Sequence, residues 1–231
     1  MTEEVPIETA RLPHGYTNAT RRFDGMVRKS YLGPDPQERL RTEQAALTGM
    51  FGRFPVPRVL SSENRELWTN EVVGWHGQEV LDAPDDRRAR SVLRLCGRLR
   101  RGLSEIPPAT VPGLPGSGEV IVHGDLGPQN MLVNSEGNIA LAVFDWEWAH
   151  LGTALEDLAW TEWIVRTHHP HRVHCLDELF AGYGARPAWS ERKAEMLLIC
   201  HRCREFCRCW KSPDAVALWD ERIAATEAFR E

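Results

Sequence analysis

Short apolar runs alternate with turn-forming residues in the middle of the chain. Residues 131–133 and 139–144 are two such runs, and the Asn-Ser-Glu-Gly-Asn segment between them is typical of a turn, so together they predict a β-hairpin. A β-rich run at residues 119–122 precedes them and ends at His123, after which glycine and proline interrupt regular structure. The pattern predicts three short strands, with a loop between the first and the second. His123, at the end of a buried strand, is predicted to belong to the scaffold.

The hairpin brings three polar residues to one end of its strands. With Val133 paired near Ile139, the antiparallel register places Asn130 opposite roughly Ala142, give or take one residue, and Asp145 lies just past the same open end. Asp125 lies on the loop directly before the hairpin. We therefore expect Asp125, Asn130 and Asp145 to converge.

This set of side chains suits phosphoryl transfer. Two carboxylates and an amide oxygen in one pocket are costly unless a cation neutralises them, and magnesium prefers such oxygen ligands. The natural roles are Asp125 as the base that orients the acceptor hydroxyl, and Asn130 and Asp145 as ligands of Mg²⁺ against the phosphates. Any one of these residues alone would more often be a turn or capping residue, so the prediction depends on their combination.

Two segments resemble a known family. HGDLGPQN at residues 123–130 and VFDWEWAHLG at residues 143–152 resemble the catalytic and metal-binding loops of the aminoglycoside phosphotransferase and choline kinase family, which shares its ancestral fold with protein kinases. The resemblance implies an α+β, two-lobed protein kinase-like fold, with a small β-rich N-lobe that has one helix and a larger, mainly helical C-lobe. The implied lobes are residues 1–75, which bind nucleotide, and residues 76–231, which hold the catalytic and acceptor-binding groups.

The resemblance also implies a reaction. It is transfer of the γ-phosphoryl group from ATP or GTP, with Mg²⁺, to a hydroxyl of an antibiotic, an amino alcohol or a sugar; antibiotic resistance is accordingly among the implied roles. Gly124, where protein kinases have arginine, and Asp145-Trp146-Glu147, in place of their Asp-Phe-Gly, favour a small-molecule kinase over a protein kinase. Glu147 is expected either to assist at the metal or to lie on the surface. Asp157 resembles an aspartate that is generally structural in the family and holds the catalytic loop.

A second group of charged residues is predicted in the N-terminal third. Asp35 and Pro36 have the form of an N-cap and a first helical residue, so a helix should begin there and run to about Phe51. Glu43 falls on the apolar stripe of this helix and therefore requires a partner. The stripe consists of Leu40, Leu47, Met50 and Phe51.

Lys29, on a short strand upstream, is the main candidate for the partner of Glu43. Arg28, which points the other way along that strand, is the alternative, as is an ordinary surface pair. In kinase-like folds such a pair fixes a lysine on the α and β phosphates, and the resemblance implies this role for Lys29 and Glu43. It further implies that residues 12–20 form the phosphate-covering turn.

The connection between the lobes is expected at residues 71–77. The resemblance implies that backbone groups of Glu71 and Val73 meet the adenine edge there. Residues 151–231 have 13 acidic and 11 basic residues, a nearly even balance that gives little support to a polycationic aminoglycoside as acceptor. Trp189 and Trp219 are candidates to line an apolar acceptor.

Longer periodic segments predict helices. Residues 87–101 have apolar residues at helical spacing, with their arginines on the solvated face. Four further helices are predicted, at residues 156–165, 175–182, 191–210 and 215–229. The histidines around Pro170 are predicted to lie on a polar surface loop. The apolar face of the helix at residues 191–210 continues through Cys200, Cys203 and Cys207, so we expect these cysteines to be small buried side chains. The alternative is a zinc site formed by these three cysteines and Cys209.

Composition narrows the class of protein. The chain has 231 residues, of which 42% are hydrophobic and 26% charged, enough for a full core in one or two lobes. The net charge of −5 argues against nucleic acid as a partner. The absence of a long apolar run or a basic leader argues against a membrane and predicts a cytoplasmic protein. We expect a monomer or a homodimer. A catalytically silent kinase-fold nucleotide-binding or scaffold protein is the main alternative, and a metal-dependent hydrolase is another.

Overall fold

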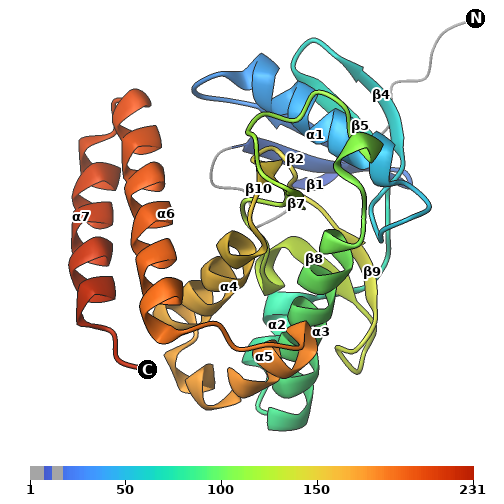
Figure 1. The fold of residues 1–231 in the computed structure, drawn as a ribbon. Helices are drawn as coiled ribbons and strands as arrows, with labels where there is room; N and C mark the ends of the chain where they lie inside the picture. The colour runs from blue at the N-terminus through green and yellow to red at the C-terminus, as the bar shows by residue number, and fades with distance from the viewer. Residues whose placement is uncertain (1–7, 12–17) are drawn as a thin grey trace, which may run out of the picture.

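The computed structural model describes residues 8–11 and 18–231 of the chain. The first third forms a five-stranded antiparallel sheet in the order β1-β2-β3-β5-β4, against which one helix, α1 (Pro36–Met50), packs (Figure 1). Tight turns join β2 to β3 and β4 to β5; in the first, Asp24 and Gly25 both have positive φ, as a type I′ hairpin turn requires. The strands are β1 (Glu8–Arg11), β2 (Asn18–Phe23), β3 (Met26–Tyr31), β4 (Val59–Glu63) and β5 (Glu66–Asn70).

The start of α1 differs in detail from the prediction. Asp35 precedes the helix, but its side chain makes no capping hydrogen bond, because its backbone is left-handed (φ 47°) rather than in the extended conformation of an ordinary N-cap. Its carbonyl oxygen instead accepts hydrogen bonds from the N–H groups of Glu38 and Arg39. At the other end, the prediction that Phe51 belongs to the apolar stripe is wrong: Phe51 follows the last turn and is 52% exposed.

The rest of the chain is mainly helical. Two small sheets lie within it: β6 (Trp75–His76), β8 (Met131–Val133) and β9 (Ala140–Val143) form one, and β7 (Val120–Val122) pairs with β10 (His150–Gly152) in the other. The predicted fold class, a β-rich N-lobe with one helix and a mainly helical C-lobe, is confirmed. The helices are α2 (Gly77–Asp82), α3 (Asp86–Ser104), α4 (Ala154–His168), α5 (Asp177–Tyr183), α6 (Trp189–Cys209) and α7 (Pro213–Ala228).

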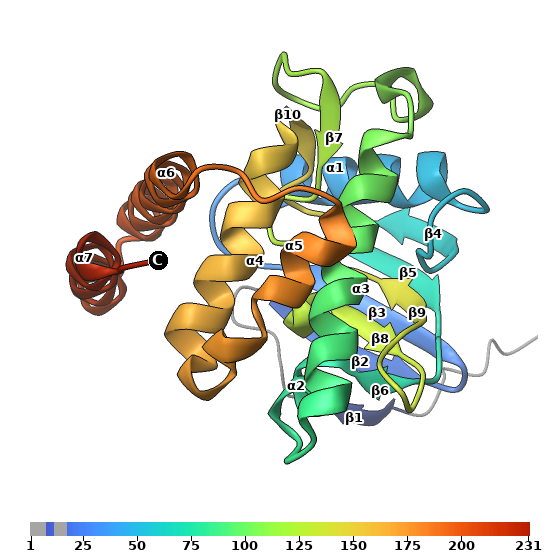
Figure 2. The same cartoon turned by 60° about the horizontal axis from the view of Figure 1, so that its bottom comes forward.

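The hydrophobic core has two parts. The larger part runs from α1 and β5 through α3 to the strands of the C-lobe, and the smaller part joins α4, α6 and α7. Figure 2 views α6 and α7 almost along their axes, side by side at one edge of the molecule. The end of α6 also approaches the N-lobe, where a Cβ atom on Gly33 would lie 2.8 Å from the ring of Trp210. Gly33 has positive φ as well, so this position requires glycine.

Two residues predicted to be exposed are buried instead. Arg100 of α3 is fully buried, where its guanidinium pairs with Asp157. His169 is buried as well, with Nδ1 2.6 Å from Oδ1 of Asp82. In both cases a partner far away in the sequence satisfies the buried polar group, which helical periodicity alone does not reveal.

The cysteines of α6 follow the helix face as predicted. Cys200 is buried in the smaller core, Cys203 and Cys207 are half-buried, and Cys209 is exposed; all are free thiols. Within residues 8–11 and 18–231, no set of three potential metal ligands includes any of them. In the part of the chain that the structure describes, no helix is long and apolar enough to cross a membrane.

Candidate active site

The β8–β9 hairpin brings Asn130 and Asp145 together, with a register that differs from the predicted one. The N–H of Phe144 donates to the carbonyl oxygen of Asn130 (3.0 Å), so Asn130 lies opposite Phe144 and not near Ala142. The turn is one residue longer than predicted, and a β-bulge between the strands adds one further residue. The shift places Asp145 immediately beyond the residue that faces Asn130.

Three N–H donors surround the carboxylate of Asp125. Oδ1 accepts from Nε1 of Trp160 (2.6 Å) and from Nε2 of Gln129 (3.1 Å), and Oδ2 accepts from Nδ2 of Asn130 (2.8 Å). Burial, reinforced by the negative charge of Asp145, raises the pKa of Asp125 to about 7, although the hydrogen bonds from Trp160 and Asn130 oppose that shift. A carboxyl group with this pKa changes its protonation state near neutral pH, as a general base requires.

His123 holds the start of the catalytic loop and lies in the scaffold, as predicted. Its ring is fully buried; Nδ1 accepts the N–H of Asp125 (3.1 Å), so Nε2, 3.0 Å from the carbonyl oxygen of Phe144, is the donor. Burial lowers the pKa of His123, which keeps the ring neutral. The neutral ring of His123 thus forms hydrogen bonds both with the loop of Asp125 and with Phe144, the residue before Asp145.

Asp157, at the start of α4, is the second anchor of the loop. Its carboxylate accepts the N–H groups of His123 (2.9 Å) and Gly124 (3.0 Å) and pairs with Nη1 of Arg100 at 2.6 Å. The contacts with His123 and Arg100 are buried, and an unpaired charge in such a place is costly. The structural role that the family resemblance implies for Asp157 agrees with these contacts.

Replacing Asp157 with alanine should destabilise the protein by about 3–5 kcal/mol, because Arg100 would remain buried without its partner. The free energy of unfolding in urea measures this loss. Asp177→Ala is the matched control, since Asp177 forms an exposed pair with Arg186 and its removal should change the stability by less than about 1 kcal/mol. Equal losses in the two variants would contradict the anchoring role.

Lys29 forms the other half of the site. Its Nζ lies 2.5 Å from Oε2 of Glu43, contacts Oδ1 of Asp145, and lies 3.3 Å from Oε2 of Glu147. Burial favours the neutral amine, but these three carboxylates outweigh it and raise the pKa of Lys29 well above its usual value. Lys29 is therefore a permanent cation in contact with the predicted metal ligand Asp145.

The two alternatives for the partner of Glu43 are resolved by these contacts. Arg28 lies over the rings of Phe23 and Trp68 and makes no ion pair with Glu43 among the described contacts. Glu43 itself is buried and also accepts a hydrogen bond from the hydroxyl of Tyr31 (2.5 Å). The pair is thus a buried one and not an ordinary surface pair.

Glu147 is buried, so the predicted alternative that it lies on the surface is excluded. It is 3% exposed and, besides contacting Lys29, it accepts hydrogen bonds from Nδ2 of Asn18 (2.7 Å) and Nη1 of Arg39 (3.2 Å). We did not predict the involvement of Asn18 and Arg39. Arg39 lies four residues before Glu43 on the same helix face, and this spacing could have indicated that Arg39 points toward the site. No feature of the sequence around Asn18 indicated its contact with Glu147.

The donor set fits a magnesium ion. Carboxylate oxygens of Glu43, Asp145 and Glu147 lie within 4.8 Å of one another, and these three charges exceed the two cations Lys29 and Arg39. The amide nitrogen of Asn130 donates to Asp125, which leaves the amide oxygen as a ligand atom. Hard oxygen ligands with excess negative charge are the environment that Mg²⁺ prefers.

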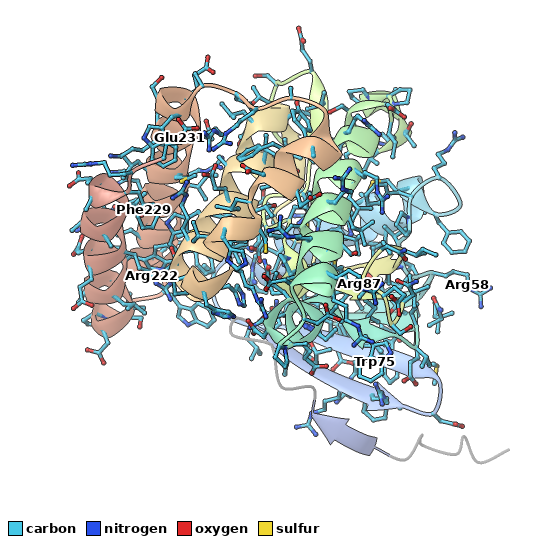
Figure 3. All side chains as sticks on the ribbon, turned by 90° about the horizontal axis from the view of Figure 1, so that it is seen from below. Arg58, Trp75, Arg87, Arg222, Phe229 and Glu231 are labelled. Atoms are coloured by element: carbon cyan, nitrogen blue, oxygen red, sulfur yellow. The ribbon has the colours of Figure 1, made fainter. Side chains whose placement is uncertain are left out.

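A cleft of about 480 Å³ is lined by Lys29, Glu43, Asn130 and Asp145 of this set. It extends from Lys29, Asn130 and Asp145 to the connection at Glu71 and Val73. Trp75, labelled in Figure 3, lies within this connection and begins β6. Of the predicted phosphate-covering turn, only residues 18–20, at the start of β2, belong to the described part of the chain; residues 12–17 lie outside it.

The backbone of the connection is partly engaged already. The N–H of Glu71 donates to Gly25 O (2.8 Å), and Glu71 O accepts from Nδ2 of Asn70 (3.1 Å). Val73 is 84% exposed at the mouth of the cleft. The carbonyl oxygen of Glu71 has a second lone pair, so it and the backbone of Val73 can still form hydrogen bonds with the edge of a bound base.

Comparison with known proteins agrees with this geometry. Residues 111–194, which include the loop of Asp125 and the β8–β9 hairpin, match the family model of the phosphotransferase enzyme family. This segment is similar in sequence to that family. The predicted family resemblance is thereby confirmed for residues 111–194. No curated protein matches the chain significantly.

Solved structures show the same phosphotransferase fold. The GDP complex of wild-type aminoglycoside 2'-phosphotransferase-IIIa has a TM-score of 0.77 at 14% identity and covers 98% of this chain and 94% of that one. A choline/ethanolamine kinase family protein from Mesorhizobium loti has a TM-score of 0.68 at 16% identity, covering 98% and 89%. Macrolide 2'-phosphotransferase MphH from Brachybacterium faecium has a TM-score of 0.67 at 16% identity, covering 96% and 93%.

Proposed function

We propose that this chain is an ATP- or GTP-dependent phosphotransferase that moves the γ-phosphoryl group to a hydroxyl of a small molecule. The observation that carries the proposal is the convergence of Lys29, Asn130 and Asp145 at one end of a cleft of about 480 Å³, with Asp125 hydrogen-bonded to Asn130 behind it. Phosphoryl transfer needs positioned groups and charge stabilisation more than covalent chemistry from the protein, and this set offers both.

The donor side is assigned to the N-lobe and the connection. Lys29, held by Glu43, binds the phosphates, and the backbone of Glu71 and Val73 receives the base of the nucleotide. The two lobes of the proposal are residues 1–75 and 76–231, joined at this connection. Support comes from the cleft, which extends between Lys29 and Val73.

The transfer itself is assigned to the C-lobe. Asn130 and Asp145 would hold Mg²⁺, which when bound supplies positive charge against the phosphate oxygens. The acceptor oxygen bonds to the γ-phosphorus, the bond from that phosphorus to the bridging oxygen breaks, and the nucleoside diphosphate leaves. Asp125 takes the proton of the acceptor hydroxyl, as its pKa of about 7 permits.

The acceptor class is an antibiotic, an amino alcohol or a sugar. The aminoglycoside, macrolide and choline/ethanolamine kinase names of the similar structures support this range. An antibiotic acceptor would make the protein a resistance enzyme. The reaction also requires a compartment that supplies ATP and magnesium, for which we propose the cytoplasm.

The test is incubation of the wild type and of Asp125→Asn with magnesium, ATP or GTP, and a pooled library of hydroxylated antibiotics, amino alcohols and sugars. Mass spectrometry should detect the gain of one phosphoryl group on an acceptor with the wild type only. Nucleotide binding without transfer to any acceptor would favour the silent kinase-fold alternative. Acceptor-independent ATP hydrolysis would favour a hydrolase, and the absence of nucleotide binding would overturn the proposal.

A further inference from the structure

We infer that Trp160 is a positioning residue for Asp125: its indole N–H fixes the carboxylate so that Oδ2 is the oxygen that receives the proton of the acceptor. The inference rests on the proposed role of Asp125 as the base. It adds a residue of α4 to the site and selects one of two otherwise equivalent oxygens.

The two oxygens of Asp125 differ in their hydrogen bonds. Oδ1 accepts from both Nε1 of Trp160 (2.6 Å) and Nε2 of Gln129 (3.1 Å). Among the contacts of residues 8–11 and 18–231, Oδ2 accepts only from Nδ2 of Asn130 (2.8 Å). Each carboxylate oxygen has about two lone-pair sites, so Oδ1 is saturated and Oδ2 retains one site. The acceptor hydroxyl can therefore donate only to Oδ2 without displacing a protein group.

Trp160 is the donor that fixes this arrangement, because its ring cannot turn. It is 7% exposed and stacks on Trp163, with ring centroids 4.5 Å apart and an interplanar angle of 5°. An indole nitrogen is also a donor only, so it cannot reverse its role as a hydroxyl can. The amide of Gln129 is less restricted, since its nitrogen also lies 3.3 Å from the backbone oxygen of Asp125.

The aromatic stack extends the support to the last helix of the chain. The ring of Trp219 lies 5.6 Å from Trp163 and 6.3 Å from Trp160, and the guanidinium of Arg222 lies 4.6 Å over Trp219. Arg222 is labelled on α7 in Figure 3. The stack thus joins α4 to α7 in the smaller core, while the N–H of Trp160 is its only contact with the carboxylate among the described residues.

The stack also contains a matched control. Trp163 has the same indole group, is buried in the same core, and donates through Nε1 to the hydroxyl of Thr226 (2.8 Å) rather than to Asp125. Trp160→Phe and Trp163→Phe each remove one indole N–H from the stack and keep a ring. Only the first removes a donor from the carboxylate.

The kinetic test uses these two variants and the acceptor found in the library screen. Trp160→Phe should lower kcat by roughly 10–100-fold with the KM for nucleotide within about twofold, because a small misplacement of a reacting group has effects of this size. Trp163→Phe should lower the melting temperature but leave kcat within about threefold. Equal kcat losses in both variants, or unchanged kcat in Trp160→Phe, would overturn the inference.

A second measurement needs no turnover and no variant of Trp160. In ¹H–¹⁵N NMR spectra, Asp125→Asn should shift the indole N–H resonance of Trp160, because a hydrogen bond to a charged carboxylate is stronger than one to an amide. The resonance of Trp163 should stay in place. An unmoved Trp160 resonance would overturn the inference even if Trp160→Phe did not fold. Failure of the proposed function would appear separately, as a wild type without transfer activity.

Discussion

Replacing Asp125 with asparagine should lower phosphoryl transfer by roughly 10²–10⁴-fold, because the amide cannot take the proton of the acceptor hydroxyl. Nucleotide affinity should stay within about twofold of the wild type, since Asp125 does not line the cleft that extends from Lys29 to Val73. The two quantities are measured as kcat with a saturating acceptor and as the dissociation constant of the nucleotide by calorimetry.

The control for this variant is Asp214→Asn, which makes the same chemical change at an exposed position on α7. It should leave both kcat and nucleotide affinity at wild-type values. Asparagine at position 125 keeps the size of the side chain, so the loss should not come with a large change in melting temperature. Transfer at the wild-type rate would remove Asp125 from the reaction.

The second large effect is expected at Asp145. Asp145→Ala should weaken magnesium-dependent nucleotide binding by at least roughly 10–100-fold, because the variant removes a proposed direct ligand of the ion, and even supporting residues around metals have effects of this size. The loss should appear as a collapse of the difference in affinity between measurements with Mg²⁺ and with a chelator. Lys29 should remain charged, since Glu43 and Glu147 still face it.

Asp24→Ala is the matched control for that experiment. Asp24 is also an aspartate with positive φ, but it occupies the exposed β2–β3 turn and not the cleft. Its replacement should leave the effect of magnesium on nucleotide affinity unchanged. If Asp145→Ala binds nucleotide as tightly and with the same magnesium dependence as the wild type, the metal assignment is wrong.

Local features of the site were predictable because the residues concerned are near one another in the chain. Asn130 and Asp145 are joined by a single hairpin, and Glu43 lies in the helix that directly follows the strand of Lys29. Strand alternation and helical spacing were therefore sufficient to expect the Asn130–Asp145 pair and the Lys29–Glu43 pair. The register of the hairpin was not predictable to the residue, because the bulge that shifts it has no clear signature in a short apolar strand.

Contacts over long sequence distances were not predictable. Glu147 meets Asn18, which is 129 residues away, and Arg39, which is 108 residues away, and nothing in the local pattern around Glu147 indicates burial. The bond from Trp160 to Asp125 is of the same kind, since periodicity places Trp160 in a core without indicating what its N–H meets. Buried polar partners of this kind depend on tertiary packing, which only the folded arrangement determines.

The contact of Trp210 with Gly33 has a consequence for the reaction cycle. Gly33 lies two residues beyond β3, the strand that contains Lys29, whereas Trp210 directly follows α6 of the C-lobe. If the proposed transfer includes a hinge motion that widens the cleft, that motion would either separate Gly33 from Trp210 or move α6 and α7 together with the N-lobe. Under that proposal, release of the nucleotide and the position of α6 and α7 would be coupled through the close approach at Gly33.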